Sequence, residues 1–399
     1  MAVGLACAAA ALVMGASSTR GLGPARPASP VARPWSGLGR PPAASGDRLG
    51  VDAGAGPGTT EGAPGGPGAE PRAIAAPPGR EMYRQRGVAL GMFAEDVSFS
   101  YAPLLEEIAG LGATHVALVV PIYQTNGRSS DLALHTRYSP TLGLLADTVR
   151  VARRERLEVT VFPIVRLADP GPGEWRGNLA PQDVRAWFAR YGELLGDLAA
   201  VAAQTGATRL AIGSELSSLD ARLDAWRPLL ERVRAIYPGR LLYSANWDHF
   251  KDVPLFDLVD EDGLVAYFPL RSSAKSPLDD AALVTAWRGV QAEILGWHRA
   301  RSQGARSIDR PHPLVLTEVG YRSRAGATAE PWDESSGGIV DLEEQRRAFA
   351  AFRKVWSGGP QLDGIYVWNW YGYGGPTSTG YTPRGKPAAA EIRQLLQDL

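Results

Sequence analysis

The chain has little of what metal, thiol or serine chemistry requires. Cys7 is the single cysteine in 399 residues, so an intrachain disulfide and a multi-thiolate metal site are excluded. The five histidines are scattered and form no H-x-H or H-E-x-x-H pair, which argues against a zinc hydrolase. The sequence also has no G-x-S-x-G nucleophile elbow, which a serine hydrolase of the α/β type would need. Finally, 42 basic residues balance 42 acidic ones, so no nucleic-acid partner is expected.

Aromatic residues are absent between Ser36 and Met82, where Pro, Gly and Ala dominate. Such a segment cannot bury enough apolar surface to offset its ordering entropy, so we expect residues 21–82 to be a disordered linker. In the N-terminal segment 1–20, residues 2–17 are almost entirely small or apolar and rich in Ala. This run is too short to make a good membrane span and is similar to the core of a secretory signal without its basic n-region. We therefore expect a folded domain at 83–399, exported (secreted, periplasmic or surface-tethered) and without a transmembrane domain.

From residue 83 onward, short apolar runs alternate with longer amphipathic stretches. Near-continuous apolar strands alternating with helices indicate a parallel sheet that is covered on both faces. Eight such units in about 310 residues predict a single (β/α)₈ barrel, an α/β fold. An open doubly wound sheet is the alternative, but its nucleotide fingerprint is missing at the first strand-to-helix turn. The eight strands are expected at 87–93, 114–121, 158–165, 209–214, 240–245, 263–269, 313–319 and 364–370.

Polar and aromatic residues gather where these strands end, which is where barrel enzymes place their chemistry. In chain order these residues are Gln124, Arg166 with Trp175 in the loop beyond, Ser214 with Glu215, Asn246 with Trp247, Tyr267, Glu318, and Trp368 with Trp370. Flat aromatic faces suit the C–H faces of sugar rings, and amide, guanidinium and hydroxyl groups suit sugar hydroxyls. Several have a plainer interpretation: the tryptophans can be packing residues, and Arg166 can be a salt-bridge partner.

Glu215 follows the fourth predicted strand and Glu318 stands at the end of the seventh, so their side chains can converge over the barrel axis. Alone, Glu215 could be a first-turn acid of the next helix, and Glu318 could pair with Arg322. Together they fit the two carboxylates that cleave acetals, of which one is ionised and the other keeps its proton. For a retaining reaction we predict carboxyl groups about 5–5.5 Å apart.

Five motifs in order, "IGSEL", "YSANWD", "AYFPL", "LTEVGYRS" and "GYTPRGKPA", resemble glycoside hydrolase family 113, whose best-known members are β-mannanases among the clan A retaining glycosidases. The resemblance covers about residues 84–399. It implies that Glu215 is the general acid/base, that Glu318 is the nucleophile and that Tyr267 hydrogen-bonds the nucleophile. It also implies a subsite floored by Trp368 and lined by Asn246 and Trp247, with Arg166 and Trp175 as further contacts. No metal ion or organic cofactor is implied.

Ser214 departs from the clan pattern, in which Asn precedes the acid/base and binds the sugar 2-hydroxyl. Because mannose and glucose differ at C2, this departure leaves the sugar open between mannan, xylan, glucan and other glycans. We expect a monomer with a carbohydrate substrate. The alternatives are a catalytically silent barrel that binds surface glycans, and a scaffold carried on the Pro/Gly-rich segment.

Overall fold

The computed structural model describes residues 84–96, 98–304, 312–334, 337–358 and 362–399. The expected signal-like segment and linker, residues 1–82, lie outside them. In the described part, no helix is both long and apolar enough to span a membrane.

Eight parallel strands close into a barrel, as the sequence predicts. β1 pairs with β2 on one side and with β9 on the other, so the sheet has no open edge and the doubly wound alternative is excluded. A ninth strand, β3, is a two-residue antiparallel addition to β2 that the sequence did not indicate. The strands are β1 (Gln85–Gly91), β2 (His115–Gln124), β3 (Leu132–Ala133), β4 (Glu158–Leu167), β5 (Arg209–Ser214), β6 (Arg240–Ala245), β7 (Glu261–Val265), β8 (Leu314–Val319) and β9 (Gly364–Val367).

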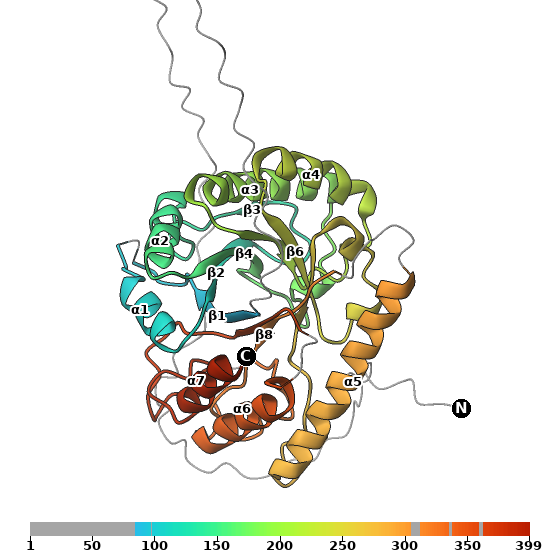
Figure 1. Ribbon diagram of the computed structural model, residues 1–399. Helices are drawn as coiled ribbons and strands as arrows, with labels where there is room; N and C mark the ends of the chain where they lie inside the picture. Colours follow the sequence, from blue (N-terminus) through green and yellow to red (C-terminus); the bar gives the residue numbers. More distant parts are fainter. Residues whose placement is uncertain (1–83, 97, 305–311, 335–336, 359–361) are drawn as a thin grey trace, which may run out of the picture. The chain divides into compact units, whose positions relative to one another are not determined.

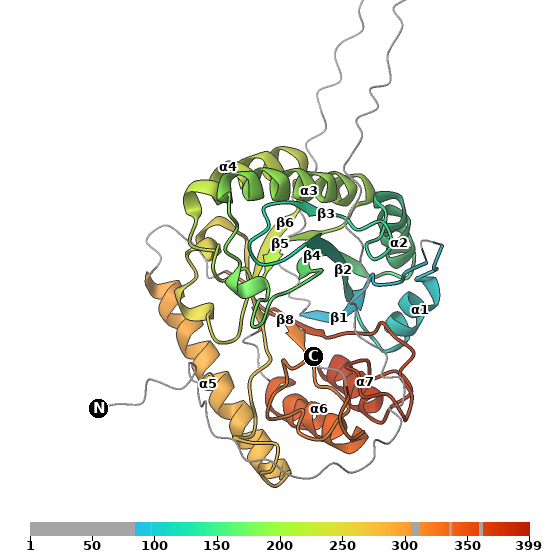
Figure 2. The ribbon, with the colours of Figure 1, turned by 180° about the vertical axis from the view of Figure 1, so that it is seen from behind.

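In the described part of the chain, α-helices alternate with the strands and cover the outside of the barrel (Figures 1 and 2). Asp183 caps α3 by accepting a hydrogen bond from Ala186, and Gly206 ends it in the left-handed conformation, where glycine carries no steric cost. Two short 3₁₀ segments, η2 (Phe250–Asp252) and η3 (Pro254–Leu258), join β6 to β7. The helices are α1 (Ala102–Gly110), α2 (Leu142–Arg154), α3 (Val184–Thr205), α4 (Leu223–Ile236), α5 (Asp280–Gly304), α6 (Leu342–Trp356) and α7 (Ala388–Asp398).

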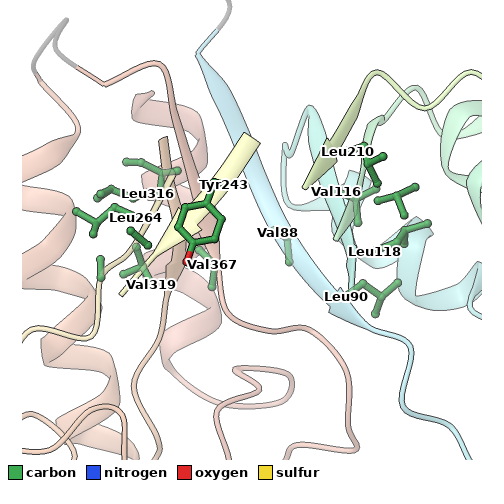
Figure 3. Close-up of a cluster of buried hydrophobic side chains, with 14 of the residues drawn as sticks. Val88, Leu90, Val116, Leu118, Leu210, Tyr243, Leu264, Leu316, Val319 and Val367 are labelled. Carbon is green, nitrogen blue, oxygen red and sulfur yellow. The ribbon is translucent and has the colours of Figure 1, made fainter. Parts of the chain in front are cut away.

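Alternate strand residues supply two cores. Outward-facing residues such as Val88, Leu118 and Leu316 pack under the helices (Figure 3). Inward-facing residues such as Ala89 and Phe162 fill the barrel interior. The period-2 alternation of side chains along a strand produces both layers. Because side chains fill the barrel interior, an active site is expected at the carboxyl ends of the strands.

Three strands end earlier than expected, and the first of them is β1, which stops at Gly91. β7 stops at Val265 and β9 at Val367, so Tyr267 and Trp368 stand just beyond the ladder rather than within it. The chain remains attached there, because the Trp368 amide donates to the Val319 carbonyl at 2.9 Å. These side chains therefore rise from a fixed rim at the carboxyl end of the barrel.

Candidate active site

Glu215 directly follows β5 and has a backbone φ of 54°, a left-handed conformation that is uncommon for a residue with a side chain. Such a conformation costs about 1–3 kcal/mol and persists only where neighbouring groups enforce it. Here the Glu215 amide donates to the Ser244 carbonyl at 2.8 Å, and the next amide, of Leu216, donates to the Tyr243 hydroxyl at 3.0 Å. β6 thus holds Glu215 in a strained and defined position.

Glu318 lies within β8 and accepts a hydrogen bond from a tyrosine just beyond the end of the neighbouring strand, β7. The Tyr267 hydroxyl donates to Glu318 Oε2 at 2.9 Å, and the Ala266 amide donates to the Glu318 carbonyl at 2.7 Å. Both the carboxyl and the phenol are buried. A hydroxyl that donates to a carboxylate stabilises its ionised form and fixes its orientation.

Burial dominates the electrostatics of this carboxyl pair. Burial raises the pKa of Glu215, and the nearby Arg176 guanidinium opposes that rise. Burial and the Glu215 carboxylate together raise the pKa of Glu318 to about 8, against the effects of Arg176 and the Tyr267 hydroxyl. Because neither carboxyl ionises easily beside the other, the pair retains one proton near neutral pH. The Tyr267 hydrogen bond favours that proton on Glu215, whereas the Arg176 ion pair favours it on Glu318, so the raised pKa belongs to the pair.

Arg176 is a neighbour of the pair to which the sequence assigned no role. It begins the 3₁₀ segment η1 (Arg176–Asn178) in the loop after β4, and its Nη1 lies 3.2 Å from Glu215 Oε2. Its side chain is only 20% exposed. A largely enclosed guanidinium beside a carboxylate is a strong electrostatic partner.

Aromatic side chains stand at the same end of the barrel as the pair. Trp368 belongs to the core of the barrel interior, and its ring lies 6.4 Å from that of Phe93. Trp247 stacks on Trp332 with ring centroids 5.1 Å apart and planes inclined by 21°. Trp332 comes from the long loop after β8 and is 43% exposed, so it presents an open aromatic face at this end of the barrel. Its motif, "PWDE", carries no strand or helix signal, which is why the sequence did not single it out.

Other predicted contacts lie at the rim with identifiable partners. The Asn246 amide donates to Asp248 at 2.7 Å. The Arg166 guanidinium lies 5.5 Å from the centre of the Phe93 ring and 4.0 Å from a carboxylate oxygen of Glu334, in the loop after β8. The Ser214 hydroxyl is buried and has no hydrogen-bond partner among the described residues. Trp175, next to Arg176, is 38% exposed.

Two predicted residues face away from the pair or are already engaged. Trp370 packs in the outer core, and its indole N–H donates to Glu107 of α1 at 2.7 Å. The Gln124 amide donates to the Asn126 carbonyl and accepts from the Trp187 indole. Both side chains therefore have structural contacts of their own.

Comparisons with known proteins agree with this geometry. The family model described as Glycoside Hydrolase Family 113 matches residues 91–379. No curated protein matches the chain.

Solved structures with the same fold include three glycoside hydrolases. The GH113 β-mannanase from Alicyclobacillus acidocaldarius is 23% identical, with a TM-score of 0.68 over 79% of this chain and 97% of that one. A GH113 β-1,4-mannanase solved as a complex is 19% identical, with a TM-score of 0.65 over 79% and 99%. A GH5_18 protein from Streptomyces cattleya, bound to Manβ1-4GlcNAc, is 14% identical, with a TM-score of 0.52 over 78% and 80%.

Proposed function

The chain belongs to glycoside hydrolase family 113 and is a glycoside hydrolase; from this premise we propose that it cleaves β-1,4-linked mannan by double displacement, with Glu318 as nucleophile and Glu215 as acid/base. The observation that carries the assignment of roles is the hydrogen bond from Tyr267 to Glu318, because it favours the ionised form of one member of a buried carboxyl pair. The choice of mannan rests on the similar structures that are named as mannanases.

In the first step, an oxygen of Glu318 attacks the anomeric carbon while Glu215 gives its proton to the departing glycosidic oxygen. The C–O bond to the leaving sugar breaks, and an ester forms between Glu318 and the remaining sugar. In the second step, Glu215 takes a proton from water, the water oxygen attacks the same carbon and the ester bond breaks. Two inversions at that carbon retain its configuration.

The aromatic faces and rim hydroxyls have places in this scheme. Trp368 beside the pair floors the subsite of the attacked sugar, and the exposed face of Trp332, stacked on Trp247, supports a neighbouring ring. The unpartnered Ser214 hydroxyl is available for a sugar hydroxyl next to Glu215. Polar groups that lack a protein partner are commonly completed by the ligand.

One experiment tests both substrate and mechanism. The full chain is incubated with β-1,4-mannan, xylan and β-1,4-glucan, and the released oligosaccharides are identified by mass and linkage. Proton NMR of the first seconds of turnover then shows which anomer forms first. We expect manno-oligosaccharides and the β-anomer. Products from xylan or glucan alone would overturn the choice of mannan, and an α-anomer formed first would overturn double displacement.

A further inference from the structure

The ion pair between Arg176 and Glu215 has no place in the first step of the proposed reaction. That step needs a proton on Glu215, whereas a guanidinium 3.2 Å from Glu215 Oε2 favours the carboxylate. The second step has the opposite need, since Glu215 must then be ionised to accept a proton from water. Through Glu215, Arg176 is thus placed to assist the second step and to oppose the first, while its charge also favours the ionised form of Glu318.

Hydrogen bonds on both sides hold the loop that carries Arg176. Before it, Glu174 accepts from the amides of Gly127 and Gly171, each at 2.9 Å. After it, the Gly177 carbonyl accepts from the amide of Ser218, three residues beyond Glu215, at 3.0 Å. The loop is therefore attached directly to the segment that bears the acid/base. Several independent hydrogen bonds set the position of this loop. They therefore also fix the position of Arg176 next to Glu215.

The other groups that face Glu215 disfavour its ionised form or are neutral. They are Glu318 in β8, Glu334 in the loop after β8, Asp248 after β6, and the hydroxyls of Tyr243 and Tyr267. The acidic groups repel a negative charge on Glu215 and thereby keep its proton in place during the first step. Once Glu318 is esterified, its charge is gone and this repulsion falls. Arg176 remains to stabilise the carboxylate.

We infer that Arg176 is a positioning residue for the second half-reaction, where it holds Glu215 in the ionised form that takes a proton from the incoming water. The inference rests on the proposed function, because it presumes an ester on Glu318. Among the described residues, Glu215 forms an ion pair with the Arg176 guanidinium, the Nε of Arg176 has no hydrogen-bond partner, and Glu334 and Glu318 act on the guanidinium through their charge. A neutral side chain of similar length at this position would leave Glu215 protonated to higher pH.

The test is kinetic and compares wild type with Arg176→Met. With a 2,4-dinitrophenyl β-mannoside, whose leaving group needs no proton, the second step limits turnover. We expect the acid limb of kcat for this substrate to move up by about 1 pH unit or more, and kcat below that limb to fall at least about tenfold. On mannan, where departure of the sugar needs the acid, the loss is smaller. Arg176→Lys, which keeps the charge but not the planar fork, restores part of the shift.

Controls separate this role from a structural one. Arg185→Met removes an exposed arginine at the start of α3 and is expected to leave the limb unmoved. An Arg176→Met protein that loses activity equally on both substrates, with an unmoved limb, would overturn the inference, as would unchanged kinetics. Arg176→Gln is the second neutral variant if the methionine variant does not fold.

A direct titration gives an answer that does not depend on turnover. In protein labelled with ¹³C at the glutamate carboxyls, Glu215→Gln identifies the Glu215 signal. Its midpoint should rise by about 1 pH unit or more in Arg176→Met, and an unmoved midpoint overturns the inference. If the wild type hydrolyses none of the glycans, the proposed function fails instead, and the catalytic role of Arg176 fails with it.

Discussion

At the amino end of the barrel strands, Glu261 of β7 is fully buried and accepts hydrogen bonds from Arg209, Arg240 and Gln85 at 3.1–3.3 Å. At the carboxyl end, Glu318 of β8 is almost as buried, but the described side chain that donates to it is the Tyr267 hydroxyl, and a second carboxyl faces it. The same residue type is neutralised at one end and left short of partners at the other.

The two ends of the barrel differ in whether neighbouring groups compensate the cost of burying a carboxylate. Cationic groups around Glu261 compensate the cost of burying its charge. Around Glu318, burial and the Glu215 carboxylate raise the carboxyl pKa, and the Arg176 guanidinium and the Tyr267 hydroxyl offset that rise only in part. The strained φ of Glu215 and the unpartnered hydroxyl of Ser214 are further costs at the same end. Costs of this kind are expected where a protein preorganises a reaction.

Glu318→Gln should have the largest effect on function. Glutamine keeps the size of the side chain and can still accept the Tyr267 hydrogen bond, but it cannot act as the nucleophile. We expect kcat on mannan to fall about 10⁴-fold or more, with the far-ultraviolet circular dichroism unchanged. Activity within tenfold of wild type would remove Glu318 from the role.

Glu261→Gln is the matched change at the other end of the barrel. It leaves Arg209, only 14% exposed, beside a neutral amide, and breaking a buried ion pair in this way costs about 3–5 kcal/mol. We expect a lower free energy of unfolding in urea, with kcat of the folded protein close to wild type at 25 °C. A variant that keeps its stability but loses activity would contradict the assignment of Glu261 to stability rather than to catalysis.

Two matched Tyr→Phe substitutions test the difference between the two ends of the barrel by removing one hydroxyl at each end. Tyr267→Phe removes the donor to Glu318, and a hydrogen bond to a charged group is worth about 1.5–3 kcal/mol. We expect kcat/KM to fall about 10- to 100-fold with little change in stability. At the amino end, Tyr366→Phe removes a donor to Gln85 and should cost about 1 kcal/mol of stability with kcat/KM unchanged. Kinetics and urea unfolding of both variants check this division, and equal kinetic losses would contradict it.

The barrel and the positions of the two glutamates at the carboxyl end of its strands could be predicted from the sequence, because local patterns of residues indicate both. Apolar runs of strand length mark each β/α unit, and the residue that ends a run lies at a known end of the barrel, as Glu215 does after β5. Arg176 and Trp332 could not be assigned in this way. Their positions depend on how long loops fold back, as when Glu174 accepts a hydrogen bond from the amide of Gly127 in another loop. Nor did any local pattern signal the left-handed backbone of Glu215, which β6 imposes through Ser244 and Tyr243.

The smallest expected effect is a pH-dependent gain in stability at the carboxyl end. Burial and the Glu215 carboxylate raise the pKa of Glu318 to about 8 in the folded chain, compared with about 4.3 for an exposed glutamate. The folded state therefore binds this proton more tightly than the unfolded state, so the carboxyl favours folding below about pH 4 and that contribution is lost as the pH rises toward 8. Since glutamine does not ionise, Glu318→Gln should melt about 2–5 °C above wild type at pH 8 and close to it at pH 4. Calorimetry between pH 4 and 8.5 measures the difference, and a constant offset across this range would mean that the Glu318 carboxyl is not short of partners after all.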